Sequence, residues 1–129
     1  MRVLLDTQCW LWMNLAPDRL SSGARAILSS PDTELWLSAA SVWEIVIKHA
    51  LGKLRLPLTP GEYVTSRMTR DGVRPLAIGV DHTLRVADLE AHHRDPFDRL
   101  LIAQAQCEEV PIMTNDPQFA AYGIEVVEA

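Results

Sequence analysis

Short apolar runs with β-strand character alternate with longer stretches of helical periodicity along this chain. The apolar runs lie at residues 2–5, 34–38, 74–78, 110–114 and, more weakly, 124–127. Helical patterns lie at 9–15, 21–29, 41–50, 60–70, 81–90 and 97–108. A helix is the usual connection between two parallel strands, so the alternation predicts an α/β fold. We expect a central parallel sheet of four to five strands, flanked by helices on both faces.

The bulk properties of the chain predict one ordinary globular domain over residues 1–129. Of its 129 residues 48% are apolar, which is enough for a core without disulfides. No apolar run approaches the roughly 20 residues of a membrane span, and residues 1–10 do not resemble a signal peptide. Cys9 and Cys107 are expected to be reduced thiols. We therefore expect a cytoplasmic protein with no membrane partner.

Four acidic residues stand where strands end or helices begin. Asp6 and Asp116 fall just past the ends of predicted strands, and Glu44 and Asp98 lie in the first turns of predicted helices. In a parallel sheet these points share one edge, so the four carboxylates are expected to converge. Like charges about 4 Å apart repel by roughly 4 kcal/mol per pair at an effective dielectric near 20, which exceeds the ~1 kcal/mol of a helix cap. Such a cluster favours a bound Mg²⁺ or Mn²⁺ ion, which can activate water against a phosphodiester.

Each acid taken singly also has a local explanation. Asp95 can cap the helix that follows it, and Asp98 then lies at its third position, where a negative charge suits the helix dipole. Ser41 and Glu44 have the spacing of a capping box, and Glu44 can also pair with Lys48 one turn later. Only the joint placement of the four acids favours a site over these capping roles.

Four segments of the chain resemble the successive motifs of PIN-domain ribonucleases, most closely the VapC toxins of bacterial toxin–antitoxin pairs. These segments are LLDTQCWLW, LSAASVWEI, DPFDRLLIAQA and PIMTNDPQF. The resemblance implies that the catalytic and metal-binding acids are Asp6, Glu44, Asp98 and Asp116. Thr7 and Thr114 match supporting hydroxyl positions of the family. Asn115 matches a variable polar position that contacts water or phosphate, and Arg99 is expected either to meet a phosphate or to lie in solvent.

The same resemblance implies a function and partners. A VapC-like chain would be a Mg²⁺- or Mn²⁺-dependent endoribonuclease that leaves a 5′-phosphate and a 3′-hydroxyl. Its partners would be an RNA substrate, an antitoxin that silences it and a second copy of the same chain. Alternatives with the same fold are a housekeeping nuclease in RNA maturation, a DNA-flap nuclease and a catalytically silent binding module. A silent module is expected to lack one of the four acids, and this chain has them all.

Two other acidic-site classes fit the sequence less well. A phosphatase of the haloacid dehalogenase type needs a second aspartate two residues after the first, and Gln8 stands there. A receiver-like domain needs paired early acids and a lysine after a late strand, but Pro117 follows Asp116. The acids of this chain therefore favour a metal-dependent nuclease.

The net charge of −5 argues against a nucleic-acid partner, because such binders are usually basic. The four candidate site acids supply most of this excess, so bound cations would weaken the objection. Basic side chains could then form an RNA-facing rim at one of two places. The two groups are Arg67, Arg70 and Arg74, and His92, His93 and Arg94. The adjacent histidines are not expected to bind a transition metal, because neighbours on a loop rarely face one ion.

Four tryptophans are many for a domain of this size. They are Trp10, Trp12, Trp36 and Trp43. Core packing is the expected role of Trp36. It is also the expected role of Trp10 and Trp43, for which a groove for an amphipathic antitoxin segment is the alternative.

Overall fold

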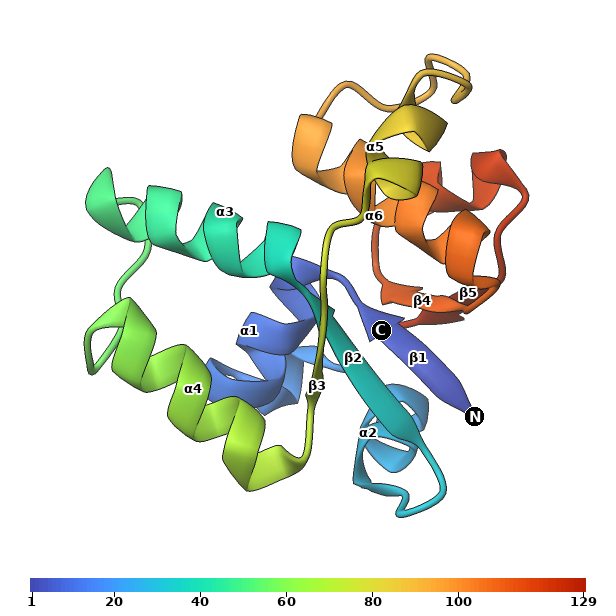
Figure 1. Ribbon diagram of the computed structural model, residues 1–129. Coiled ribbons are helices and arrows are strands. Elements are labelled where there is room, and N and C mark those ends of the chain that lie inside the picture. Colours follow the sequence, from blue (N-terminus) through green and yellow to red (C-terminus); the bar gives the residue numbers. More distant parts are fainter.

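A computed structural model describes all of residues 1–129. Six α-helices and two short 3₁₀ helices alternate with five strands (Figure 1). The first half contains β1 (Arg2–Leu5), α1 (Thr7–Leu15), η1 (Pro17–Arg19), α2 (Ser22–Ser29), β2 (Glu34–Ser38), α3 (Ala39–Ala50) and α4 (Pro60–Asp71). The second half contains β3 (Arg74–Leu76), α5 (Val80–Val86), α6 (Pro96–Glu108), β4 (Ile112–Thr114), η2 (Pro117–Tyr122) and β5 (Val126–Glu128).

The five strands form one parallel sheet in the order β3-β2-β1-β4-β5. β1 lies at the centre, where Leu4 pairs with Trp36 on one side and with Ile112 on the other. The order reverses at β1, because the chain moves outward to β3 and then crosses to β4. Ligand sites in such sheets lie beyond the carboxyl ends of the strands at this reversal. The α/β architecture expected from the alternating pattern is confirmed.

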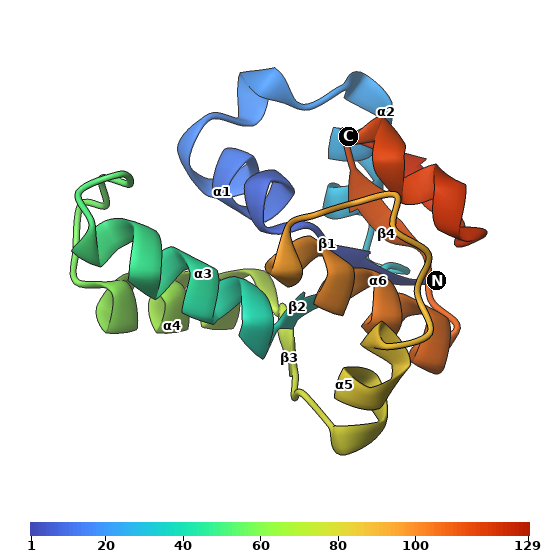
Figure 2. The same ribbon diagram turned by 90° about the horizontal axis from the view of Figure 1, so that it is seen from above.

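Alternate residues of the strands supply two apolar cores, one on each face of the sheet. Val3 and Leu5 pack with buried residues of α1, α2 and α4. Leu4 and Ile112 face the opposite side, where they pack with α6 and η2. Figure 2 shows α1 and α2 on one side of the strands and α5 on the other. Both faces are covered, which explains why the central strands are almost continuously apolar.

Helix α3 begins three residues earlier than a capping box at Ser41 predicts. Ser38 is the N-cap, and its side chain accepts a hydrogen bond from the backbone N–H of Ala40. Ser41 lies inside the helix, fully buried, and accepts a hydrogen bond from the Thr7 hydroxyl at 2.8 Å. The capping-box interpretation of Ser41 and Glu44 is therefore wrong, because a contact between α1 and α3 uses the Ser41 hydroxyl.

The tryptophans have different environments. Trp10 is fully buried, and its ring packs edge-to-face on Tyr63. Trp43 is 59% exposed, and its ring packs edge-to-face on Phe97. The core role expected for Trp43 is wrong, because Ser41, Glu44 and Ile45 form the inward face of α3 and residue 43 lies on the opposite face.

None of the helices has the length and apolar character needed to span a membrane.

A polar cluster joins β2, α5 and α6, and we call Ser38, His82, Gln104 and Glu108 the Gln104 cluster; its first three members are buried, and Glu108 is partly exposed. The Ser38 hydroxyl donates to Gln104 Oε1 at 2.5 Å, and Gln104 Nε2 donates to the carbonyl of Ala77 at 3.2 Å. His82 Nδ1 accepts from the backbone N–H of Gly79, and its Nε2 lies 3.0 Å from Glu108 Oε1. Each of these buried groups has a partner, so the cluster ties α6 to the sheet without an unpaired charge.

Candidate active site

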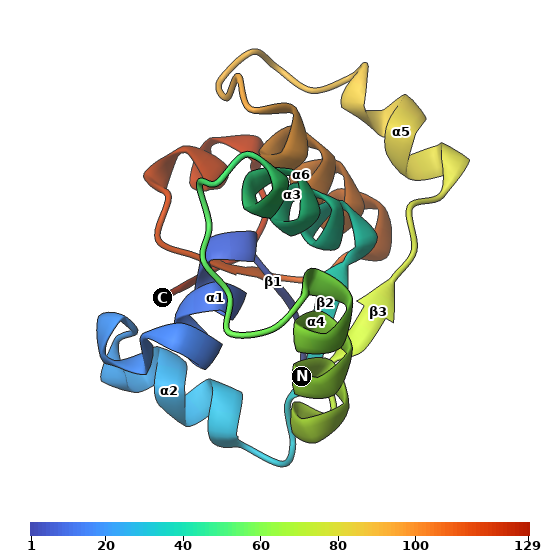
Figure 3. The same ribbon diagram turned by 90° about the vertical axis from the view of Figure 1, so that its left-hand side faces the viewer.

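The four acids expected to converge line one pocket at the carboxyl edge of the sheet. Asp6 follows β1, Asp116 follows β4, Glu44 comes from α3, and Asp98 comes from the first turn of α6. Figure 3 shows α3 and α6 next to one another above β1. The cavity has a volume of about 210 Å³. We call it the acidic pocket, and its lining residues are Asp6, Thr7, Gln8, Leu11, Glu44, Lys48, Asp95, Asp98, Asn115 and Asp116.

Asp6 is held in place by a threonine from the neighbouring strand. The Thr114 hydroxyl donates to Asp6 Oδ2 at 2.7 Å, and the backbone N–H of Asp116 donates to the same hydroxyl at 3.0 Å. Asp6 stands at the N-cap position of α1, yet its side chain makes no capping hydrogen bond. Burial raises the pKa of Asp6, and the charges of Glu44 and Asp116 raise it further. One oxygen of the carboxylate is therefore held by the neighbouring strand, and the side chain lines the acidic pocket.

Asp95 and Asp98 both line the acidic pocket but make different contacts, and the capping role predicted for Asp95 is confirmed. Asp95 caps α6, and its Oδ1 accepts from the backbone N–H groups of Phe97 and Asp98 at 2.8 and 3.3 Å. Asp98 lies in the first turn of α6 and lines the pocket, and its side chain is 18% exposed. Burial, with the charges of Asp6 and Asp95, raises the pKa of Asp98 to about 7. Ionising a largely buried carboxyl group beside other negative charges costs free energy, and a cation bound next to it lowers that cost.

Glu44 and Lys48 form the ion pair expected from their spacing. Lys48 Nζ lies 2.7 Å from Glu44 Oε2, and the hydrogen bond to Glu44 raises the pKa of Lys48. The other oxygen, Glu44 Oε1, is buried and has no hydrogen-bond partner, and Glu44 is only 6% exposed. An unpaired buried acceptor costs roughly 1–3 kcal/mol, and more when it is charged. Glu44 Oε1 is therefore a buried acceptor without a hydrogen-bond partner in a residue that lines the acidic pocket.

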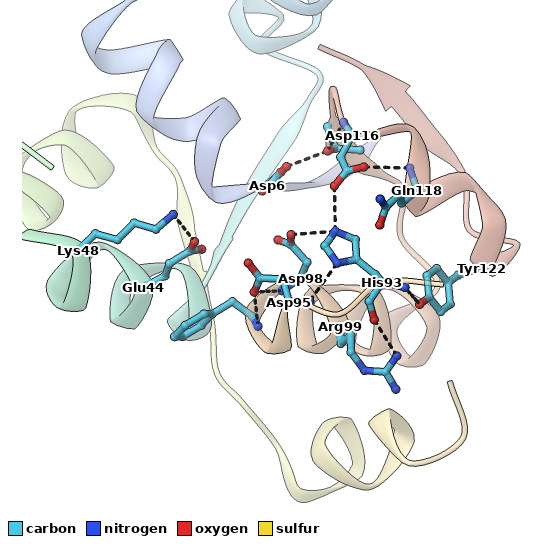
Figure 4. Close-up of polar contacts among 12 residues, drawn as sticks. Asp6, Glu44, Lys48, His93, Asp95, Asp98, Arg99, Asp116, Gln118 and Tyr122 are labelled. Atoms are coloured by element: carbon cyan, nitrogen blue, oxygen red, sulfur yellow. Dashed lines mark hydrogen bonds and ion pairs between the residues drawn. The ribbon is translucent and has the colours of Figure 1, made fainter. Parts of the chain in front are cut away.

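His93 reaches two of the four acids from the segment between α5 and α6. Its Nε2 lies 2.9 Å from Asp116 Oδ2 and 3.1 Å from Asp98 Oδ2 (Figure 4). The sequence suggests His93 as one member of a basic rim and disfavours it as a metal ligand, because nothing in a loop pattern shows which way a side chain points. The signal that was available is proximity, since His93 precedes Asp98 by five residues.

The proposed supporting residues divide into those near the carboxylates and those turned away. Thr114 bonds Asp6, and Thr7 and Asn115 line the pocket. Thr7 donates to Ser41 rather than to an acid. Arg99 points away from the carboxylates in Figure 4 and donates to the backbone carbonyls of Val86, Glu90 and His93. Its guanidinium thus holds the segment that precedes α6, which differs from the phosphate contact considered for it.

Most residues of the two expected basic rims have protein partners of their own. Arg70 pairs with Asp71 and also donates to Asn14. Arg74 lies at the start of β3, at the opposite end from the acidic pocket, and faces Glu34. The group Arg67, Arg70 and Arg74 does not line the acidic pocket.

Comparison with known proteins places this chain in a family. Residues 3–125 match the sequence model of the PIN domain. The chain belongs to the PIN domain family. A curated relative, ribonuclease VapC16 of Mycobacterium tuberculosis, is 44% identical over 69 residues, which are 54% of this chain and 48% of that protein. The match to this relative thus spans about half its length.

Solved structures share the PIN fold over nearly the whole chain. VapBC2 from Rickettsia felis, bound to a DNA fragment from its promoter, has a TM-score of 0.71 at 15% identity, with 98% of both chains covered. DNA-bound VapBC from Salmonella typhimurium has a TM-score of 0.70 at 14% identity, with 98% of this chain and 97% of that chain covered. FitAcB from Neisseria gonorrhoeae has a TM-score of 0.63 at 20% identity, with 98% and 96% covered. The family resemblance seen in the four sequence motifs is confirmed.

Proposed function

We propose that this PIN domain is a metal-dependent endoribonuclease and the toxin of a toxin–antitoxin pair. The observation that carries the proposal is the meeting of four carboxylates from four separate elements in one pocket, with Glu44 Oε1 buried and unpartnered. The curated relative named a ribonuclease supports the chemistry, and the relatives solved as VapBC complexes support the toxin role. Helix capping alone would not bring the four carboxylates together, because their mutual repulsion exceeds the stabilisation that a helix cap provides.

The pocket residues fit a hard divalent cation. Asp6, Asp98 and Asp116 would hold the ion, and Glu44 would hold a second ion or orient the attacking water. Carboxylate oxygens are the donors that Mg²⁺ and Mn²⁺ prefer. When bound, such an ion supplies positive charge that favours deprotonation of water and offsets the charge of the phosphate being attacked.

The chain's own side chains position the reactants. Thr114 fixes Asp6 through its hydroxyl, so that one oxygen is engaged and the carboxylate cannot rotate freely. Lys48 is the one basic residue in the pocket lining, and it holds Glu44 Oε2 while leaving Oε1 open. The half-exposed Lys48 ammonium is also the group best placed to meet an approaching phosphate. Cleavage by water at phosphorus would leave a 5′-phosphate and a 3′-hydroxyl.

The proposed toxin has two protein partners, an antitoxin and a second copy of itself. An antitoxin could silence it by placing an arginine or lysine among the carboxylates, where that cation would replace the metal. Exposed apolar side chains on two helices support a homodimer, and they are Trp43, Val46 and Leu51 near α3 with Val80 and Leu84 on α5. A cytoplasmic location remains a prediction that belongs to the same proposal.

RNA cleavage by the purified chain tests the nuclease. A mixed pool of structured RNA is incubated with Mg²⁺ or Mn²⁺ and then with EDTA, for the wild type and for Asp98→Asn. We expect metal-dependent cutting that Asp98→Asn reduces by more than about 100-fold, because the substitution removes a proposed ligand. Phosphatase sensitivity and ligation of the cut ends identify the 5′-phosphate and the 3′-hydroxyl.

Asp95→Asn is the matched control, because it alters a neighbouring aspartate whose capping role asparagine can fill. Cutting by Asp98→Asn at the wild-type rate would overturn the proposed site. Absence of cutting with either metal, in a folded protein free of antitoxin, would favour a binding module instead. Co-expression with the short reading frame next to the gene tests the toxin role, since an antitoxin should copurify with the chain and suppress cutting.

A further inference from the structure

His93 is the one imidazole in contact with the acidic pocket, and its contacts fix how the ring is protonated. The side chain is 11% exposed and its ring packs edge-to-face on Phe119. Nε2 faces Asp116 Oδ2 at 2.9 Å and Asp98 Oδ2 at 3.1 Å. His93, Asp98 and Asp116 thus bring three potential ligand atoms within 4.8 Å of one another. Two roles are chemically open to the histidine, a metal ligand or a hydrogen-bond donor.

The other ring nitrogen decides between these roles. His93 Nδ1 accepts a hydrogen bond from the backbone N–H of Asp95 at 3.1 Å. A backbone N–H only donates, so Nδ1 must present its lone pair there. The proton of the neutral ring is then on Nε2, the nitrogen that faces the acids. A protonated ring nitrogen has no lone pair for a metal, so Nε2 donates to Asp116 instead.

The backbone around His93 is held from two directions. The backbone N–H of His93 donates to the Tyr122 hydroxyl at 2.7 Å, and that hydroxyl donates to the carbonyl of Glu90 at 2.9 Å. Arg99 Nη1 donates to the carbonyls of His93 and Glu90 at 3.2 and 3.0 Å. These contacts explain why Arg99 is turned away from the carboxylates. They also make the ring a fixed feature of the site rather than a side chain of a free loop.

The geometry points to His93 as a positioning residue that holds Asp116 and Asp98 for a shared cation without binding the cation itself. This inference rests on the proposed function of the acidic pocket. The Nε2–H places the positive end of a dipole between two carboxylates that otherwise repel one another. Asp116 is held at both oxygens, because its Oδ1 also accepts from the backbone N–H of Gln118 at 2.9 Å. Each carboxylate oxygen retains a lone pair for the metal.

Nitrogen NMR of the wild-type protein tests the protonation directly. Long-range ¹H–¹⁵N correlation spectra of the histidine rings are recorded for the metal-free and the Mg²⁺-saturated protein. We expect His93 to carry its proton on Nε2 in both samples. Pulsed EPR of the Mn²⁺ complex should show no directly bound nitrogen. An unprotonated Nε2 in the Mg²⁺-saturated protein, or a nitrogen bound to Mn²⁺, would overturn the inference and make His93 a ligand.

Two substitutions test the effect on metal binding. His93→Phe keeps a ring against Phe119 but removes the donor, and we expect Mn²⁺ affinity, measured by calorimetry, to fall about 10–100-fold. His93→Gln retains an N–H near the position of Nε2, and we expect it to recover most of that loss. Wild-type affinity in His93→Phe, or equal losses in both variants, would contradict the donor role. Thermal unfolding of each variant confirms that it is folded.

The outcomes separate this inference from the proposed function. If the wild type binds neither Mg²⁺ nor Mn²⁺, the proposed function of the pocket fails and the positioning role fails with it. If the wild type binds metal and cleaves RNA while His93→Phe binds Mn²⁺ equally well, only the inference fails.

Discussion

The acidic pocket and the Gln104 cluster are both polar and largely buried, but they differ in how their groups are satisfied. In the Gln104 cluster, Ser38, Gln104 and His82 each meet a partner of complementary character. In the acidic pocket Glu44 Oε1 has no partner, and burial raises the pKa of Asp6 and Asp98. Satisfied buried groups stabilise a fold, whereas neighbouring buried acids destabilise it until a ligand arrives. Substitutions in the two regions should therefore change stability in opposite directions.

The histidines sharpen this comparison, because the same local arrangement occurs in both regions. His82 and His93 each accept a backbone N–H at Nδ1 and direct Nε2 at a carboxylate. His82 meets Glu108, which is on the helix that His82 helps to anchor. His93 instead meets two acids from different elements, Asp98 and Asp116. The chemistry of the ring is alike, so the partners and not the histidine determine whether the contact serves the fold or the site.

The largest expected effect is the loss of stability in Gln104→Ala. The substitution leaves the Ser38 hydroxyl and the Ala77 carbonyl without their partner and opens a cavity beside α6. We expect the free energy of unfolding, from urea denaturation, to fall by about 2–4 kcal/mol. Mn²⁺ affinity of the folded protein should remain within about threefold of the wild type, since no ligand moves. Gln106→Ala, on the same helix but outside the cluster, is the control. A loss of metal binding in Gln104→Ala would show that the two regions are coupled.

In the absence of metal, Asp98→Asn is expected to raise the free energy of unfolding, whereas Gln104→Ala lowers it. The pKa of Asp98 is about 7 in the folded protein and 3.8 for the free group. Between these pH values the folded state retains a proton that the unfolded state has released, so stability falls as pH rises through this window. The full shift corresponds to about 4 kcal/mol, and relaxation of the pocket will reduce it. We expect Asp98→Asn to be more stable than the wild type by about 1–3 kcal/mol at pH 8, and equally stable near pH 4.

Urea denaturation in EDTA at the two pH values measures this difference. Saturating Mg²⁺ should stabilise the wild type and leave Asp98→Asn unchanged, because binding to the folded state adds to its stability. A mutant that is less stable than the wild type at pH 8 would mean that the Asp98 carboxylate is stabilised by its surroundings.

A smaller effect is expected for Tyr122→Phe, which loosens the support of His93 without touching an acid. The backbone N–H of His93 and the carbonyl of Glu90 lose their shared hydroxyl. We expect a stability loss of about 1 kcal/mol and a Mn²⁺ affinity about 3–10-fold weaker. Calorimetry of Tyr122→Phe beside Tyr63→Phe, which removes a hydroxyl on α4, measures the difference. Equal affinity in the two variants would mean that His93 holds its place without Tyr122.

The smallest effect is expected for Asp95→Asn. Asparagine caps a helix about as well as aspartate, so stability should change by less than about 0.5 kcal/mol and RNA cleavage by less than about threefold. Cleavage assays and urea denaturation of the variant measure both quantities. Inactivity comparable to that of Asp98→Asn would make Asp95 a fifth acid of the site and contradict its purely capping role.

The sequence by itself determined the elements, their parallel arrangement and the edge where the acids meet. Apolar periodicity and the position of an acid after a strand are local properties of the sequence. They do not depend on how the elements pack against one another. The same holds for Asp95, whose capping bonds reach only two and three residues ahead. The ion pair of Glu44 and Lys48 was predictable for the same reason, since one helical turn joins them.

Only the tertiary structure decided which serine starts α3, which face of that helix is exposed and where His93 points. Ser38 and Ser41 are equally good caps in sequence, and a contact from Thr7 on α1 settles the choice. His93 lies in a segment without periodicity, and its backbone is held by Tyr122, which lies 29 residues away in the chain. Hydrogen bonds between residues far apart in sequence depend on the packing of whole elements, and no local pattern contains that information.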